Sequence, residues 1–436
     1  MKRVFLALAL CLIAGGPLSA QTLRIYQIDV EQADAALIVM PNGKSLLIDS
    51  GKNGHGQRIR NVMTLAGVTQ IDAYVTSHYH EDHFGGIDDL VGIGVSVLES
   101  YDRGDKECCL SDEKKEEVTF IDYQAAVGED AIELRASHLI NLDPMVTITA
   151  ISSGGRVMGQ ADNSTGVDEN DMSVSLLINF RGFKAFYGGD IEAPTEAKIA
   201  ALDLVMDVDL YKANHHGSHS SSSSAFMNDL RPSVVVISNG SHGGHKHPRR
   251  VSLNTYAALA NPPAVFQTNR CLHPAPCGNV PNASIADPET TDEDGTILIT
   301  VNAGTNNYSV QYGTTTRTLT VKNPSAGPAP TTPSVVISSL LPNPVGDDVQ
   351  SESVTITNKG TSVSLIGWTL QDRSGATWNL SGSIAAGQSR TFRRNGQAMT
   401  LNNAGDEIVL LNPEQVEQDR FSYDASTEGV VIQTQH

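Results

Sequence analysis

Three histidines and one aspartate lie close together in the chain, at His78, His80, Asp82 and His83, after an apolar segment, residues 71–76. We expect that segment to be a strand, so that His78 and His80 point the same way and can bind one cation. Asp82 and His83 lie beyond the bend and can face a second cation. Imidazole and carboxylate groups bind zinc, and also manganese or iron, so the cluster predicts a metal site.

Two later segments place further ligand types at the ends of strands. Asp190 follows two glycines after a predicted hairpin, residues 174–187, and glycine lets the backbone approach a neighbour closely. A buried aspartate without a partner is costly, which favours a ligand role. A strand predicted over residues 209–213 delivers the paired histidines His215 and His216. Either histidine can complete a second metal centre, and the sequence does not decide which.

The first cluster, His-x-His-x-Asp-His after an apolar strand, resembles the metallo-beta-lactamase superfamily. The resemblance implies an α/β fold, a four-layer αβ/βα sandwich with the metal site at one edge. It also implies two divalent ions, with zinc expected and manganese or iron as alternatives, and Asp190 as the bridging carboxylate. The implied metal ligands are His78, His80, Asp82, His83, Asp190, His215 and His216. Many relatives with two metals have a further histidine motif, which the surroundings of His138 do not match, so we interpret His138 as structural.

Further stretches narrow the resemblance to the ComEC-type competence hydrolases, a metallo-beta-lactamase branch linked to DNA uptake. They are Asp-Val-Glu-Gln-Ala-Asp-Ala at residues 29–35, Leu-Ile-Asp-Ser-Gly at residues 47–51 and His-His-Gly-Ser at residues 215–218. Family members usually have glycines where this chain has Glu31 and Ala33. By resemblance Asp49 supports the metal loop by bonding to its histidines, as carboxylates often do; an ordinary turn aspartate is the alternative.

The same resemblance implies residues that act on the substrate. Asn170 and Ser173 match the family's Asn-x-x-Ser segment, and Ser218 belongs to the His-His-Gly-Ser motif, so we expect all three to contact substrate. His247 resembles the family's His-Pro before its last helix and is our candidate for phosphate contact or for proton donation to the leaving group. One of the paired histidines is an alternative donor, and we expect Asp82 to handle a proton in catalysis.

We expect four segments along the chain. Residues 1–20 have a basic start, an apolar run and a final small residue, which predicts a signal peptide and a secreted or periplasmic protein. Residues 21–322 carry the hydrolase motifs. Residues 323–333 are rich in proline, alanine and threonine and predict a linker. Residues 334–436 show short strands with regular turns, which predicts an all-β domain.

That last segment resembles a lamin-tail domain, an immunoglobulin-like sandwich. Gly-Trp-x-Leu-x-Asp at residues 367–372 and Asn-x-Gly-Asp at residues 403–406 carry the resemblance. We expect Trp368 to lie in the core of this domain. The resemblance implies an accessory or targeting role, in which the domain binds a surface or another macromolecule.

The net charge limits which partners the chain can bind, and the cysteines indicate the cellular compartment. The chain of 436 residues has a formal net charge of −19 at pH 7, which counts against tight non-specific DNA binding, although bound cations invert the local field. Cys271 and Cys277 are expected to close a small loop in an exported protein. For Cys108 and Cys109 a vicinal bridge, two free thiols or a bond elsewhere remain open. After the signal peptide no stretch is apolar enough to cross a bilayer.

Together these features predict a secreted metal-dependent hydrolase, a binuclear phosphodiesterase or nuclease in which a metal-bound hydroxide attacks the phosphodiester. A basic groove would support a nucleic-acid substrate, and the candidates for it are Lys212, Lys246, Arg249 and Arg250. A small phosphodiesterase similar to phosphorylcholine esterases is one alternative, and it would need an aromatic box for choline. The missing histidine motif weakens the case for a third alternative, hydrolysis of a lactone or β-lactam. A non-catalytic protein that binds a surface or DNA is the alternative of a different class.

Overall fold

The computed structural model describes residues 21–104, 117–160, 168–241, 244–288, 295–303, 305–324, 335–359, 363–365, 367–385, 388–413 and 416–434. The chain divides into two compact units, Met1–Gly327 and Pro328–His436. The predicted signal peptide, Cys108, Cys109 and residues 325–333 of the predicted linker lie outside the described residues. Among the residues that are described, none forms a helix long and apolar enough to cross a membrane.

The first sheet of the N-terminal unit has the strand order β18-β17-β16-β1-β2-β3-β4-β5-β6. Its strands are β1 (Thr22–Gln27), β2 (Ala36–Val39), β3 (Ser45–Ile48), β4 (Ala73–Val75), β5 (Ser100–Asp102), β6 (Ile132–Glu133), β16 (Ile297–Asn302), β17 (Asn307–Tyr312) and β18 (Thr315–Thr320). Strands β3, β4, β5 and β6 are parallel neighbours. The carboxyl ends of parallel strands meet at one edge, so Asp49 after β3 and Ser77 after β4 lie together there.

The second sheet has the order β15-β14-β13-β12-β11-β10-β8-β7, with β9 also paired to β8. Its strands are β7 (Leu139–Ile140), β8 (Val146–Ser153), β9 (Arg156–Val157), β10 (Ser175–Phe180), β11 (Phe183–Tyr187), β12 (Leu210–Lys212), β13 (Val234–Ile237), β14 (Ala264–Asn269) and β15 (Ile285–Asp287). Strands β11 to β14 are parallel. The segments after β11, β12 and β13 therefore leave from one edge and carry Asp190, His216 and Ser238.

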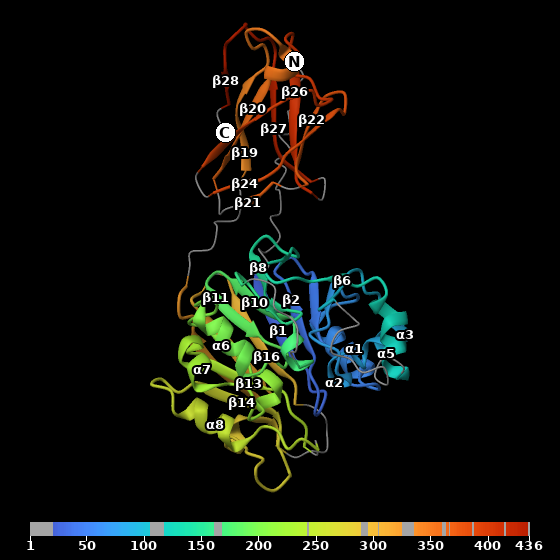
Figure 1. The fold of residues 1–436 in the computed structure, drawn as a ribbon, viewed down its shortest axis with the longest axis vertical. Coiled ribbons are helices and arrows are strands. Elements are labelled where there is room, and N and C mark those ends of the chain that lie inside the picture. The colour runs from blue at the N-terminus through green and yellow to red at the C-terminus, as the bar shows by residue number, and fades with distance from the viewer. Residues whose placement is uncertain are drawn as a thin grey trace, which may run out of the picture. The chain divides into compact units, whose positions relative to one another are not determined.

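Helices cover the outer face of each sheet, which completes the four-layer αβ/βα sandwich expected from the sequence. Alternation along β2 sends Ile38 into the core between the sheets and Leu37 toward the helices. The helices on that side are α1 (Gly56–Ala66), α2 (Glu81–Phe84), α3 (Ile87–Gly92), α5 (Val118–Tyr123) and the π-helical η1 (Gln124–Gly128). The outer face of the second sheet packs against α6 (Ala193–Ala201), α7 (Ser224–Leu230) and α8 (Arg250–Ala257). Figure 1 shows the two groups of helices on opposite sides of the strands.

The short turns η2 (Asn170–Met172), η3 (Asn214–Gly217) and η4 (Asn282–Ser284) complete this unit. The sequence also predicts a helix over residues 57–65 and a strand over residues 45–48, and both coincide closely with α1 and β3. It further predicts a strand over residues 95–99, and this prediction is wrong. Only Val97 of that segment forms a strand-type bridge, to Ile71, and regular pairing starts at Ser100.

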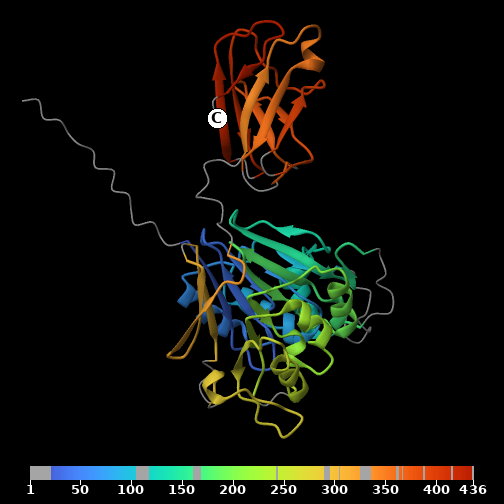
Figure 2. The same cartoon turned by 90° about the vertical axis from the view of Figure 1, so that its left-hand side faces the viewer.

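The described residues of the C-terminal unit form β-strands and one short helix, and the strands are drawn in orange to red in Figure 2. Its sheets have the orders β25-β20-β19-β28, β23-β22-β26-β27 and β21-β24. The elements are β19 (Val335–Leu341), α9 (Asp348–Ser351), β20 (Ser353–Asn358), β21 (Val363–Ser364), β22 (Thr369–Asp372), β23 (Thr377–Asn379), β24 (Ser383–Ile384), β25 (Ser389–Arg393), β26 (Asp406–Leu411), β27 (Glu417–Tyr423) and β28 (Ile432–Gln433).

The core of this unit contains both tryptophans of the chain. Trp368 is 8% exposed, which confirms its predicted place in the core, and Trp378 is fully buried and donates its Nε1–H to the carbonyl of Met399 at 2.8 Å. The apolar pattern also predicts one strand over residues 363–370, and this prediction is wrong. Gly367 has a φ of 82°, in the left-handed region that glycine tolerates, and this turn separates β21 from β22.

Candidate metal centre

The loop after β4 brings two of its histidines together as the sequence predicted. His78 is fully buried, and its Nε2 lies 2.8 Å from Nδ1 of His80. The rings of His78 and His83 are 4.2 Å apart between centroids. Because β4 ends at Val75 and α2 begins at Glu81, His78 and His80 lie in the loop between them while Asp82 and His83 lie on the helix. Two imidazole nitrogens therefore face one another next to a second histidine–aspartate pair.

Asp190, which follows β11 of the second sheet, lies close to histidines from both sheets. Its Oδ2 lies 3.3 Å from Nε2 of His83 and 3.6 Å from Nε2 of His216. The same His216 nitrogen is 3.5 Å from Oδ2 of Asp82. Gly189, before Asp190, has a φ of 60°, and a Cβ there would meet Ser173 at 2.9 Å and Ser77 at 3.0 Å. Glycine therefore allows this segment to approach the metal loop.

The polar atoms of this cluster fit a metal ion. Nε2 of His83, Nε2 of His216 and Oδ1 of Asp190 are buried and have no hydrogen-bond partner, a costly arrangement for polar groups in the absence of a ligand. One ligand atom each from Asp34, His83, Asp190 and His216 lies within 4.8 Å of the others. Buried imidazole and carboxylate groups of this kind suit a divalent cation such as zinc, manganese or iron.

The paired histidines take different positions. Both have left-handed backbone angles, with φ of 50° for His215 and 53° for His216. His216 is buried and its Nδ1 lies 3.1 Å from the carbonyl oxygen of Ser238, which leaves Nε2 for the cluster. His215 is partly exposed, and its Nδ1 lies 3.2 Å from Oε1 of Glu192 while its Nε2 is 3.9 Å from Asp190. Nε2 of His216 is therefore directed into the cluster, whereas His215 lies beside Glu192; both residues line the pocket described below.

Asp34 and Lys212 form a buried ion pair beside the cluster that the sequence analysis did not predict. The ammonium of Lys212 donates to Oδ2 of Asp34, and it lies 3.4 Å from the carbonyl oxygen of Gly189 and 3.9 Å from Oδ1 of Asp190. A carboxylate that already holds a cation is a poor free ligand, so we interpret Asp34 as the partner of Lys212. Two features of the sequence could have suggested this ion pair: Asp34 in the segment after β1, and a lysine inside the apolar strand β12.

Asp49 binds the metal loop at two residues. Its Oδ1 accepts the backbone N–H of Ser77 at 2.7 Å, and its Oδ2 accepts the Ser77 hydroxyl at 2.8 Å. The same Oδ2 lies 2.8 Å from Nδ1 of His83. A carboxylate on Nδ1 fixes the imidazole with Nε2 directed at the cluster. Asp49 is thus placed to orient His83, in the way the resemblance implied.

Electrostatics favour an ionised carboxylate between the imidazoles. Burial alone would raise the pKa of Asp190, but His83, His216 and His215 outweigh burial and hold this pKa well below its usual range. Burial, followed by the neighbouring His216 and His215, lowers the pKa of His247 to about 2, so its ring is neutral at pH 7. An ionised aspartate is the protonation state that a metal ligand needs.

A pocket of about 530 Å³ opens over the cluster. Its lining residues are Gln32, Lys52, His80, Glu81, Asp82, Asn170, Asp190, His215, His216, His245 and His247. Asn170 and His247 are therefore at the pocket. Ser218 and Ser173 are buried and do not line it; the Ser173 hydroxyl instead accepts the Asp190 N–H at 3.1 Å and donates to the carbonyl of Asn170.

Lys52 is a cation at the pocket that the sequence analysis missed, whereas Lys212, a candidate for a basic groove, is buried in its ion pair. His138 is exposed and is not among the described residues that line the pocket; its structural role stays a prediction.

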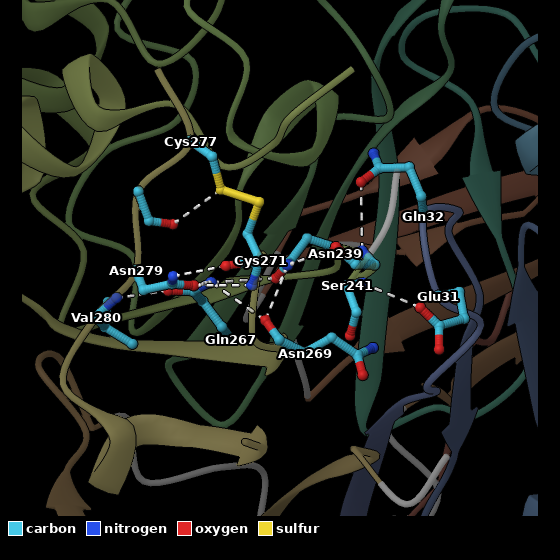
Figure 3. Close-up of a disulfide and its surroundings, with 12 residues drawn as sticks. Glu31, Gln32, Asn239, Ser241, Gln267, Asn269, Cys271, Cys277, Asn279 and Val280 are labelled. Atoms are coloured by element: carbon cyan, nitrogen blue, oxygen red, sulfur yellow. Dashed lines mark hydrogen bonds between the residues drawn. A yellow bond between two sulfur atoms is a disulfide. The ribbon is translucent and has the colours of Figure 1, made fainter. Parts of the chain in front are cut away.

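A disulfide supports the loops at the pocket rim. Cys271 and Cys277 are bonded, which confirms the predicted loop closure (Figure 3). The N–H of Leu272 donates to the carbonyl of Ser241 at 2.9 Å, and the N–H of Ser241 donates to Glu31 at 3.1 Å. After the disulfide, the N–H of Gly278 donates to the carbonyl of Pro248 at 2.8 Å. This loop therefore contacts the chain on both sides of His245 and His247.

Comparison with known proteins identifies both units. The family model of the beta-lactamase superfamily domain matches residues 44–237, and that of the lamin tail domain matches residues 328–425. Recombination protein 2 of Haemophilus influenzae is 27% identical over 239 residues, 53% of this chain and 26% of that protein. ComE operon protein 3 of Bacillus subtilis is 22% identical over 253 residues, 52% of this chain and 29% of that protein. Competence protein ComA of Neisseria gonorrhoeae is 26% identical over 232 residues, 51% of this chain and 28% of that protein.

The chain thus spans less than a third of the length of these curated relatives. Among solved structures, a protein from Parabacteroides distasonis described as a metal-dependent hydrolase is similar over 55% of this chain and 90% of that chain, with 11% identity and a TM-score of 0.34. A variant metallo-beta-lactamase from Cronobacter sakazakii is similar over 44% of this chain and 77% of that chain, with 19% identity and a TM-score of 0.30. The chain therefore contains a beta-lactamase superfamily domain with competence-protein relatives, followed by a lamin tail domain.

Proposed function

We propose that the N-terminal domain is a binuclear metal-dependent phosphodiesterase that acts on nucleic acid. The observation that carries the proposal is the convergence of buried, unpartnered imidazole and carboxylate atoms at the base of an open pocket. The competence-protein relatives support a nucleic-acid substrate. In this proposal the substrate enters the open pocket of the N-terminal domain from solvent and is hydrolysed there.

In this proposal His78 and His80 hold one metal, and Asp82, His83 and His216 hold the other. Oδ2 of Asp190 lies 3.3 Å from Nε2 of His83 and 3.6 Å from Nε2 of His216, and by the resemblance this carboxylate would complete both sets. Two divalent ions, when bound, lower the pKa of a water molecule and neutralise charge on a phosphate oxygen. Zinc suits the histidine-rich set, with manganese or iron as alternatives.

The remaining pocket residues bind and orient the substrate. Glu192 holds Nδ1 of His215, so that Nε2 of His215 can bond to the leaving oxygen. His247 is neutral and also lines the pocket, where it can donate a hydrogen bond to a phosphate oxygen. Lys52 supplies a positive charge at the same pocket, which offsets the acidic character of the chain for an anionic substrate. Asp82 lines the pocket with a side chain that is 23% exposed; burial alone would raise its pKa, but His216 and His83 outweigh burial and hold this pKa well below its usual range, which suits an ionised metal ligand.

The pocket lining disfavours a choline ester as substrate. No tryptophan, tyrosine or phenylalanine is among the described residues that line the pocket, and recognition of a quaternary ammonium group uses such aromatic faces. A nucleotide needs charge and hydrogen bonding from the pocket, which Lys52, Asn170 and His245 offer.

Export through the predicted signal peptide is part of the proposal. The Cys271–Cys277 disulfide supports it, because structural disulfides persist in oxidising compartments. The lamin tail domain is proposed to hold a surface or another macromolecule, since its described residues are engaged in a packed β-core and no metal cluster is found among them.

The test measures metal content together with hydrolysis of bis-p-nitrophenyl phosphate by the full chain. Asp190→Asn is expected to lose bound metal and turnover, while Asp207→Asn, which alters an exposed ion pair with Arg231, is expected to keep both. Two equivalents of metal in the wild-type protein, followed by cleavage of oligonucleotides, are the expected result. A protein that binds two metals but cleaves neither the chromogenic diester nor oligonucleotides would refute the proposal.

A further inference from the structure

We propose that Glu169, oriented by Arg103, positions the metal-binding histidines His78 and His80 by accepting the backbone hydrogen bond of Tyr79 between them. Glu169 and Arg103 are then positioning residues of the metal centre. The inference rests on the metal site of the proposed function, and it concerns two residues that are not among the described residues lining the pocket.

The contact is direct and buried. The N–H of Tyr79 donates to Oε1 of Glu169 at 2.7 Å, across 90 residues of sequence. Glu169 is 6% exposed and Tyr79 is 2% exposed. Because the peptide group of Tyr79 joins it to His78, this hydrogen bond restrains the backbone from which both imidazoles project.

Arg103 holds the accepting carboxylate in a fixed plane. Its Nε donates to Oε1 of Glu169 at 2.8 Å and its Nη2 donates to Oε2 at 2.7 Å, a two-pronged pairing. Nη1 donates to the carbonyl of Gly104 at 3.0 Å, and Cζ lies 4.2 Å from the centroid of the Tyr79 ring. The guanidinium thus bonds to the acceptor of the Tyr79 amide and also stacks on the Tyr79 ring.

The opposite side of His78 is fixed in the same manner. Asp49 accepts the N–H of Ser77 at 2.7 Å. Two buried carboxylates therefore bind the amides that flank His78, one at the end of β3 and one just before η2. Asp49 also touches His83, whereas Glu169 acts on the backbone alone. Positioning by Glu169 would set the orientation of His78 and His80 relative to each other.

Stability alone does not account for this ion pair. Apolar residues of similar volume commonly replace a buried ion pair without loss of stability. Arg103 is 1% exposed, so the pair lies in the protein interior, where an apolar replacement can pack. A geometric role in the metal loop gives the pair a reason to be present, and it can be separated from stability by experiment.

The experiment compares two double variants of the full chain, Arg103→Met/Glu169→Gln and Arg103→Met/Glu169→Leu. Both lose the ion pair and the stacked cation, but only the glutamine keeps an acceptor for the Tyr79 amide. Metal affinity is measured by competition with a chromophoric chelator, and exchange of the Tyr79 amide hydrogen is measured without metal. Thermal unfolding shows whether each variant is folded at the temperature of the assay.

We expect the leucine variant to bind metal 10–100-fold more weakly, the usual effect of losing a residue that orients a ligand. We expect the glutamine variant to stay within a few-fold of wild type, and the Tyr79 amide to exchange faster in the leucine variant alone. Equal affinities in the two variants, or equal losses, would overturn the inference, because the retained acceptor would then make no difference. A wild-type protein without bound metal would instead overturn the proposed function on which the inference rests.

Discussion

Replacing Lys212 with methionine should destabilise the N-terminal domain, because it leaves the carboxylate of Asp34 buried without its cation. Lys212 and Asp34 are each 3% exposed, and the ammonium lies 3.9 Å from Asp190 as well. Burial by itself lowers the pKa of Lys212, but Asp34 and Asp190 outweigh burial and raise this pKa, so the lysine is charged in the folded protein. The variant therefore places two anionic side chains together in the interior.

Breaking a buried pair by removing one partner costs about 3–5 kcal/mol. At about 2–4 °C per kcal/mol for a domain of this order of size, the unfolding temperature should fall by about 6–20 °C. The double variant Asp34→Leu/Lys212→Met removes both charges and should recover most of that loss, since no unpaired charge remains between those two positions.

Calorimetry of the full chain in the presence of a chelator is the assay, so that metal binding does not contribute to stability. The transition of the C-terminal unit serves as the internal control and should stay at its wild-type temperature. A Lys212→Met variant that loses less than about 1 kcal/mol, or a double variant that loses as much as Lys212→Met, would refute this reasoning.

Three further predictions concern other parts of the chain. Replacing Cys271 and Cys277 by serine should lower the free energy of unfolding by about 2 kcal/mol, measured by urea denaturation, because the bridge spans only six positions; no change on reduction of the wild type would contradict it. Burial, the largest influence, raises the pKa of Glu196 above 4.5 in the folded protein, so stability should fall as pH rises through the range above 4.5, and Glu196→Gln should flatten that dependence in denaturant titrations; an unchanged slope would argue against it. Trp378→Ala should cost about 3–5 kcal/mol in the calorimetric transition of the C-terminal unit and leave metal affinity unchanged; a loss of metal binding would show that the two units are coupled.

The sequence was sufficient for features that depend on neighbouring positions. The ligand types near His78 and near His216 occur within a few residues of one another, and apolar strands precede them, so short-range pattern alone predicts a metal site at strand ends. The apolar run of β3 and the helical segment of α1 were equally local. The two wrong strands, residues 95–99 and residues 363–370, have apolar patterns but lack continuous strand partners or contain a left-handed glycine.

Tertiary structure decided which side chains meet across the fold. Lys212 and Asp34 are 178 residues apart, and Arg103 and Glu169 are 66 residues apart. Periodicity indicates which face of a strand is buried, but it carries no information on which buried charge will lie opposite another. The choice between His215 and His216 was also tertiary, because a left-handed turn and the carbonyl of Ser238 direct one imidazole to the cluster and leave the other beside Glu192. These pairings exist only where two sheets bring separate strand ends to one edge, and that placement is a property of the folded chain.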